Sequence, residues 1–176
     1  MLTTHEDKLQ MLIDRAEIEN LLVRYCHAID RLDRPLLESL YWPEATDCHG
    51  LYDGSAAGFI DWVCEFLAPL KTQHFISNIW IHFDSPTTAQ GQTYIIALHQ
   101  AKTTFGGEER TDGARYLDRF EKRGNEWRFK ARTVVVDYSR LATDTEFGRL
   151  DNLPHLGGHA PDDPFYRVLS IAKDTR

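Results

Sequence analysis

The chain has 176 residues, 42% hydrophobic and 11% aromatic, a composition that predicts one folded domain and excludes a disordered chain. Its formal net charge of −7 and the lack of a basic block argue against nucleic acid or an anionic membrane as a partner. No apolar run approaches the roughly 18 residues that span a bilayer, and the polar start MLTTHEDKLQ is unlike a signal peptide. Three widely spaced cysteines without a C-x-x-C motif favour a reduced compartment, which we expect to be the cytoplasm.

The first segment has the pattern of a long amphipathic helix. Apolar side chains recur at helical spacing from Ile18 to Leu32, which predicts a helix from about residue 6 to residue 30. Asp33 followed by Pro35 is typical of the cap and first turn of a second, short helix. We expect this helix to reach about residue 41 and to end at Trp42-Pro43.

A strand and a third helix are expected next. Residues 45–52 can form a strand that Asp53-Gly54 closes. Ser55 can cap a helix that ends at Pro69. The apolar face of this helix is predicted to carry Phe59, Ile60, Val63, Phe66 and Leu67.

From residue 73 onward the apolar pattern alternates as it does in strands. Four runs are predicted, at 73–83, 90–104, 113–122 and 126–138, with turns at Asp84–Thr87, Gly106-Gly107 and Arg123–Asn125. Helices followed by long antiparallel strands indicate an α+β fold. A sheet that bends strongly around the first helix would form a cone whose apolar cavity suits a small molecule.

Four polar residues at the end of the first helix occupy different sides of it. At about 100° per residue, Tyr25 falls within about 20° of the centre of the apolar face, and His27 falls on the opposite side, where we expect it to be solvated. Asp33 is the expected cap of the next helix. Asp30 lies at the edge of the apolar face and near the negative end of the helix dipole, so its carboxylate needs a compensating partner or has a function.

Several strand residues have side chains suited to acid–base chemistry or to anion binding. His74 opens the first long strand, where a histidine is often only a surface residue. His99 shares a strand face with small apolar residues and needs a hydrogen-bond partner if it is buried. Arg132 lies among valines and requires a carboxylate or a bound anion. Tyr116 and Asp118 share another face, and they either line a wet cavity or lie on an edge strand.

Several kinds of site lack their sequence signatures. The sequence contains no glycine-rich phosphate loop, no H-E-x-x-H and no G-x-S-x-G motif. His155 and His159 are four residues apart, but Gly157-Gly158 lies between them and disfavours a helical metal pair. We therefore expect no metal and no organic cofactor, and acid–base chemistry is the remaining active alternative.

Four motifs together resemble the SnoaL-like branch of the nuclear transport factor 2-like superfamily, over about residues 8 to 140. They are IENLLVRYCHAIDRLD, WPEAT followed by LYDG, KTQHFISN, and YLDRFEKRGNEWRFKARTVVVDY. The branch includes scytalone dehydratase, hexachlorocyclohexane dehydrochlorinase and the bile-acid 7α-dehydratase. The resemblance implies a cone-shaped α+β barrel in which three N-terminal helices pack on a strongly curved, mostly antiparallel sheet.

The resemblance also implies that Asp30 and His74 form a catalytic dyad. A carboxylate bonded to one imidazole nitrogen fixes the tautomer and leaves the other nitrogen free to take a proton from a carbon atom.

Other residues match supporting positions of the branch. Tyr25, His99 and Arg132 are expected to assist the leaving group or to stabilise developing negative charge. His49 and Tyr116 are looser matches and are expected to line the pocket.

The resulting hypothesis is a cofactor-independent lyase that eliminates water from a small hydrophobic, cyclic or aromatic substrate. Loss of a halide, or of a one-carbon fragment such as formaldehyde, is an alternative reaction. Alternative functions are an isomerase with the same base, a non-catalytic ligand-binding or assembly module, and the small subunit of a ring-hydroxylating dioxygenase. An isomerase would conserve the mass of its substrate, and a non-catalytic module predicts that Asp30 and His74 do not touch.

The chain is expected to divide at about residue 140. Residues 1–140 form the SnoaL-like domain, and residues 141–176 form a C-terminal extension with the aromatic residues Phe147, Phe165 and Tyr166. This extension has too little periodicity for a core of its own, so we expect it to pack over the pocket or on a neighbouring subunit. We therefore predict a homo-oligomer, with a trimer favoured.

Overall fold

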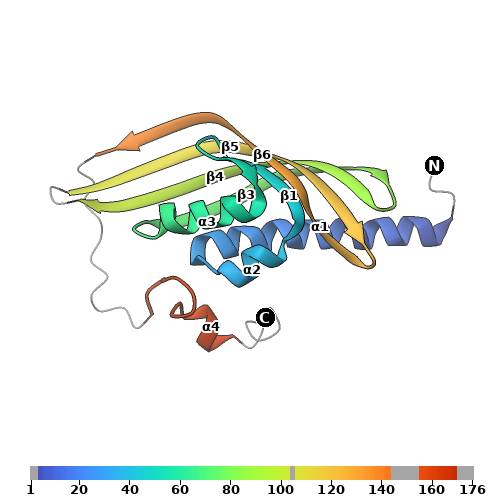
Figure 1. Cartoon of the computed structure of the whole chain (residues 1–176), viewed down its shortest axis with the longest axis horizontal. Helices are drawn as coiled ribbons and strands as arrows, with labels where there is room; N and C mark the ends of the chain where they lie inside the picture. The colour runs from blue at the N-terminus through green and yellow to red at the C-terminus, as the bar shows by residue number, and fades with distance from the viewer. Residues whose placement is uncertain (1–3, 104–105, 144–154, 170–176) are drawn as a thin grey trace.

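Helix α1 (His5–Arg31) runs along one face of the sheet, and short-range contacts fix both of its ends (Figure 1). The computed structural model describes residues 4–103, 106–143 and 155–169. Thr4 and Asp7 form a reciprocal capping box, in which each backbone N–H donates to the other's side chain at 3.0 Å. Leu32 follows the helix in the left-handed conformation, with a φ of 49°. The predicted first helix is confirmed.

Helices α2 (Arg34–Ser39) and α3 (Ala56–Leu67) begin at the caps that the sequence predicts. The Asp33 carboxylate accepts the Leu36 N–H, and the Ser55 hydroxyl accepts the Gly58 N–H, each at 3.1 Å. On the predicted apolar face of α3, Phe59, Ile60, Val63 and Leu67 are buried, whereas Phe66 is 46% exposed.

Strand β1 (Tyr41–Cys48) begins earlier than expected, and a short strand β2 (Asp53–Ser55) pairs with it. Helix α2 ends at Ser39, before the predicted end at Trp42-Pro43, and both of these residues lie within β1. The pairing of β1 with its neighbour shifts register between Tyr41 and Thr46, and this irregularity accommodates a proline that cannot donate a hydrogen bond.

Four long strands complete the sheet in the predicted order: β3 (Lys71–Ser85), β4 (Thr88–Thr103), β5 (Gly106–Arg123) and β6 (Glu126–Ala142). The strand order is β2-β1-β6-β5-β4-β3, and β1 pairs with β6 in parallel while the other neighbours are antiparallel. Gly106-Gly107 begins β5 and does not form a turn. The described residues therefore form the expected α+β architecture, with a curved sheet that does not close.

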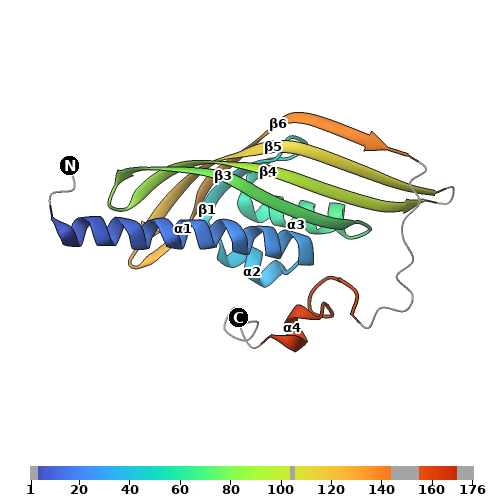
Figure 2. The ribbon, with the colours of Figure 1, turned by 180° about the vertical axis from the view of Figure 1, so that it is seen from behind.

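The sheet curves over the three helices (Figures 1 and 2). A register shift between Ser77 and Ile79 leaves Asn78 at a φ of 44°, the arrangement of a bulge that bends β3. Helices α1, α2 and α3 cover only the inner face, as Figure 2 shows from behind. No helix in the described residues is long and apolar enough to cross a membrane.

The core lies between the inner face of the sheet and the helices, and aromatic rings form its centre. The ring centroid of Tyr25 on α1 lies 6.4 Å from that of Tyr41, 5.6 Å from that of Tyr116 and 5.7 Å from that of Phe129. Tyr25 therefore points into the core, as its position on the helix predicts.

Residues 155–169, which include helix α4 (Phe165–Val168), lie against the end of α1. The His27 ring stands 4.2 Å from the Phe165 ring, and its Nε2 lies 3.2 Å from the Tyr166 hydroxyl. The prediction that His27 is solvated is therefore wrong, because the extension covers that side of the helix. Phe147 lies outside the described residues, and the division at residue 140 stays a prediction.

Candidate active site

The carboxylate of Asp30 contacts the ring of His74 directly. Asp30 Oδ1 lies 2.7 Å from His74 Nδ1, and Asp30 Oδ2 accepts the His74 backbone N–H at 3.0 Å. The end of α1 and the start of β3 bring together these two residues, which are 44 positions apart in the sequence. A carboxylate at Nδ1 places the proton of the neutral ring on that nitrogen and leaves the lone pair on Nε2.

Asp30 is buried, and three donors satisfy its carboxylate. The third donor is the Thr72 hydroxyl, 2.9 Å from Oδ1. Burial by itself raises the pKa of Asp30, but the hydrogen bonds from His74 and Thr72 outweigh it, so the pKa lies below its ordinary value. These donors compensate a carboxylate that the helix dipole disfavours.

His74 lines a cavity of about 740 Å³ between the inner face of the sheet and α3. This volume lies within the range of roughly 300–1,000 Å³ that is usual for small-molecule sites. The walls are mainly apolar, and the imidazoles of His49, His74 and His99 all reach them, as does Tyr116. The exposed ring of Phe66 also lines this cavity, which accounts for its position on α3.

His99 stands beside His74 in the wall of the cavity. The two rings meet edge to face with centroids 5.8 Å apart. His99 Nδ1 is buried and lies 3.8 Å from Asp112, too far for a hydrogen bond, and it has no other partner in the described part of the chain. Burial and the neighbouring His74 lower the pKa of His99, so its ring is neutral near pH 7 and can bind a ligand oxygen.

Arg132 lies behind the cavity wall. Its Nε and Nη2 donate to the Asp118 carboxylate at 2.7 and 2.8 Å, and its guanidinium carbon lies 3.9 and 3.8 Å from the ring centroids of Tyr25 and Tyr116. Burial works against the charge, but Asp118 raises the pKa of Arg132 well above its ordinary value. The carboxylate that the sequence requires for Arg132 is therefore Asp118.

Of the aromatic residues around Arg132, Tyr116 lines the cavity and Tyr25 lies one layer deeper. The hydroxyls of Tyr25 and Tyr116 have no hydrogen-bond partner among the described residues, and neither has Nη1 of Arg132. Contact of Tyr25 and Arg132 with a substrate stays a prediction.

A second carboxylate–imidazole pair reaches the same cavity. Asp47 is fully buried, with Oδ1 2.9 Å from His49 Nδ1, and its Oδ2 accepts the Tyr41 hydroxyl at 2.7 Å. The His49 ring stacks on Phe59 with centroids 4.7 Å apart and planes 22° apart. The Asp47 carboxylate and the Phe59 ring therefore orient His49, although the sequence predicts only a lining residue there.

A model of the SnoaL-like domain family matches residues 10–133. The chain belongs to this family. No curated protein matches the sequence.

Solved structures share the fold. A hexachlorocyclohexane dehydrochlorinase, LinA type 2, is 22% identical over 82% of this chain and 99% of its own, with a TM-score of 0.73. A LinA type 3 from Novosphingobium barchaimii is 21% identical over 81% and 99%, with a TM-score of 0.71. A scytalone dehydratase-like protein from Novosphingobium aromaticivorans is 19% identical over 85% and 99%, with a TM-score of 0.68. At these identities the likeness establishes the fold alone.

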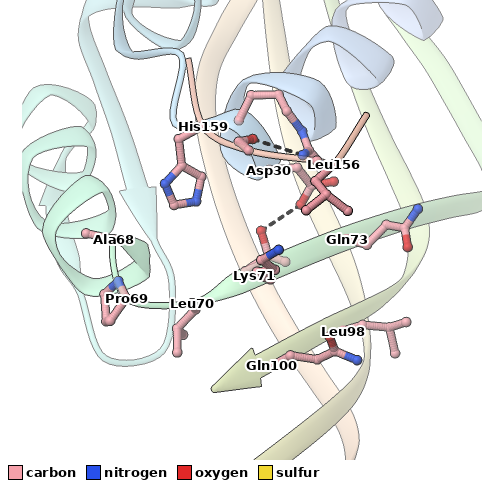
Figure 3. Close-up of a pocket in the computed structure, with 14 residues that line it drawn as sticks. Asp30, Ala68, Pro69, Leu70, Lys71, Gln73, Leu98, Gln100, Leu156 and His159 are labelled. Atoms are coloured by element: carbon pink, nitrogen blue, oxygen red, sulfur yellow. Dashed lines mark hydrogen bonds between the residues drawn. The ribbon is translucent and has the colours of Figure 1, made fainter. Parts of the chain in front are cut away.

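In this SnoaL-like protein a second cavity, of about 540 Å³, lies on the other side of Asp30 (Figure 3). Asp30 and Gln73 line it from α1 and β3, and Leu156 and His159 line it from the C-terminal extension. Arg31 anchors this part of the extension by donating to the Gly158 carbonyl at 3.0 Å. Asp30 thus lines one cavity, and its partner His74 lines the other.

Three further residues surround the site histidines, and no motif in the sequence points to them: Asp47, Thr72 and Asp112. A usable signal exists for two of them. Asp47 and His49, like Thr72 and His74, are two positions apart along an extended chain, which places their side chains on one face.

Proposed function

We propose that this protein is a cofactor-independent lyase that eliminates water from a small hydrophobic, cyclic or aromatic substrate. The observation that supports this most strongly is the Asp30–His74 hydrogen bond at 2.7 Å beside an apolar cavity. Among the structural neighbours, one is named a dehydrochlorinase and another a scytalone dehydratase-like protein, names that agree with an elimination.

His74 acts as the base in this proposal. Its Nε2 takes a proton from a carbon next to a carbonyl group, and the carbon–hydrogen electron pair forms the new double bond as the leaving group departs. Asp30 orients the ring and stabilises the imidazolium that results. Apolar walls exclude water and strengthen this attraction. His99 lines the same cavity and can donate to the carbonyl oxygen as negative charge develops on it.

The test uses two probes that differ by one hydroxyl. Benzylacetone in D₂O reports proton removal from carbon through deuterium uptake, and its β-hydroxy derivative reports dehydration through the absorbance of benzylideneacetone. We expect the wild-type protein to accelerate both reactions and His74→Ala to slow both by roughly 10²–10⁴-fold. His82→Ala is the matched control, since its side chain on the same strand is 70% exposed, and it should keep both rates.

A wild-type protein that accelerates neither reaction beyond His74→Ala would contradict the proposed function. Product mass separates the alternatives, because an isomer keeps the mass of the substrate, whereas loss of water or formaldehyde lowers it.

We also propose that the protein is a cytoplasmic homotrimer. Apolar side chains on adjoining strands of the outer sheet face support an assembly, since Phe75, Tyr94 and Ile96 are 51%, 42% and 43% exposed. Light scattering should give the mass of three chains, and deleting residues 144–176 should lower that mass or open the cavity. A monomer at all concentrations would overturn this assembly.

A further inference from the structure

Two imidazoles of the larger cavity are each bound through Nδ1 to a buried carboxylate. They reach the cavity from strands that are far apart in the strand order. His74 belongs to the edge strand β3, and His49 directly follows β1. The wall between them is formed by strands β4, β5 and β6, which contribute His99, Tyr116 and Val134 to the cavity. A substrate in this cavity can therefore have one oriented imidazole on each side.

The His49 pair is as well built as the His74 pair. Asp47 and the ring of Phe59 fix His49 from two directions, and the Tyr41 hydroxyl fixes Asp47. The His49 side chain remains 21% exposed and lines the cavity. Its Nε2 has no hydrogen-bond partner among the described residues, so it is available to a ligand.

Charges in the sheet distinguish the two rings. Asp47 on β1, Arg132 on β6 and Asp118 on β5 are register neighbours. Arg132 directs two N–H groups at Asp118, whereas Asp47 is bonded by the Tyr41 hydroxyl and the His49 ring. His49 is also the more accessible of the two rings, with 21% of its side chain exposed against 6% for His74, so it can exchange protons with solvent more readily.

The carboxylate beside His74 is compensated differently. Asp30 accepts the His74 backbone N–H and the Thr72 hydroxyl in addition to the ring N–H. These two donors stay in place whatever the protonation state of the ring. His74 is thus the more enclosed ring, which suits a base that takes a proton from carbon, and His49 is the more accessible ring, which suits an acid that solvent can reload.

We propose that His49 is a second catalytic residue, the proton donor to the oxygen that leaves as water. This inference rests on the proposed lyase function. Hydroxide is a poor leaving group and needs a proton as it departs, whereas a halide leaves without one.

The proton and electron balance of this step is complete. His74 Nε2 takes the α-proton, the carbon–hydrogen pair becomes the double bond, and the carbon–oxygen pair goes to the oxygen. That oxygen takes the Nε2 proton of His49 and leaves as water. Return of one proton from His74 to His49 through solvent restores the protein, so the net products are the unsaturated carbonyl compound and water.

The test separates the two proton transfers with the probes named above. We expect His49→Gln to slow dehydration of β-hydroxybenzylacetone by roughly 10²-fold or more, because it removes a general acid. Deuterium uptake by benzylacetone needs no leaving group, so it should stay within about threefold of the wild-type rate under the general-acid assignment. Retained deuterium uptake also shows that the variant is folded.

Each other outcome has a defined meaning. If His49→Gln keeps full dehydration, or if a folded variant loses both reactions equally, His49 is not the proton donor. His49→Asn, whose shorter amide leaves more room beside Phe59, repeats the comparison if the first variant unfolds. A wild-type protein without either activity contradicts the lyase function itself, so the two failures are distinguishable.

Discussion

Asp30–His74 and Asp118–Arg132 are both buried pairs in which one residue donates two hydrogen bonds to a carboxylate, but they leave different atoms free. His74 uses its backbone N–H and Nδ1, and its Nε2 remains available beside a cavity. Arg132 is enclosed by the rings of Tyr25 and Tyr116 and is 1% exposed. The two pairs therefore differ in whether a donor atom faces the cavity. His74 lines the cavity, whereas Arg132 and Asp118 do not.

The largest effect on stability is expected at the enclosed pair. Arg132→Met leaves the Asp118 carboxylate buried without its partner and should lower the free energy of unfolding by about 3–5 kcal/mol. Arg115→Met is the matched control, because Arg115 also donates two hydrogen bonds to one carboxylate, that of Asp137, both at 2.8 Å but with 27% and 41% of the two side chains exposed. The control should lose no more than about 1 kcal/mol in urea unfolding.

Equal losses in Arg132→Met and Arg115→Met would contradict the structural role of the enclosed pair. Replacing Asp118 by Leu together with Arg132→Met should recover part of the loss, since no unpaired charge then remains buried.

A smaller effect is expected from acid at the Asp30–His74 pair. Because the folded-state pKa of Asp30 is lowered, the stability that its charge contributes is complete above the unfolded pKa, about 3.9, and is lost as the pH falls through the folded value. The difference in unfolding free energy between wild type and Asp30→Asn should therefore be constant near neutral pH and should shrink below about pH 4. Chemical unfolding across this range measures it, and a difference that grows on acidification would contradict the hydrogen-bonded carboxylate.

The smallest effect is expected from Thr72→Val, which removes the hydroxyl donor to Asp30 and keeps the side-chain shape. Asp30 retains its two bonds from His74, so the loss of stability should be about 1 kcal/mol. Thr111→Val on β5 is the control, because Thr111 donates no hydrogen bond to Asp30. A rate loss as large as that of His74→Ala would show that Thr72 takes part in the chemistry itself.

The sequence predicts most of the fold because its signals are local. Asp33 and Ser55 are caps whose hydrogen bonds reach only three residues along the chain. The start of β1 is missed because Pro43 reads locally as a helix end, while its place in the sheet depends on irregular pairing with β6. The partial burial of His27 depends on Tyr166, which lies 139 positions later in the chain. The periodicity of the first helix carries no information about that contact.

The site is predictable in part for the same reason. Asp30 is recognisable from its unfavourable place at the end of α1, and the family resemblance supplies His74 as its partner. The role of Asp47 is less visible, because a buried aspartate on a strand has no local signature that separates it from a turn residue. Tyr41 and His49 contact it, and Phe59 packs against the rings of both, an arrangement that only the folded sheet and helices bring together.

The most direct test of the central account is a double-mutant cycle on Asp30 and His74, with deuterium uptake by benzylacetone as the measured rate. Asp30→Asn and His74→Ala should each slow uptake by roughly 10²–10⁴-fold, the first because the imidazole loses its fixed tautomer and the second because the base is gone. The double variant should be about as slow as His74→Ala alone, because the two residues act as one unit. Wild-type uptake in His74→Ala, or a double-variant loss equal to the product of the two single losses, would contradict the account.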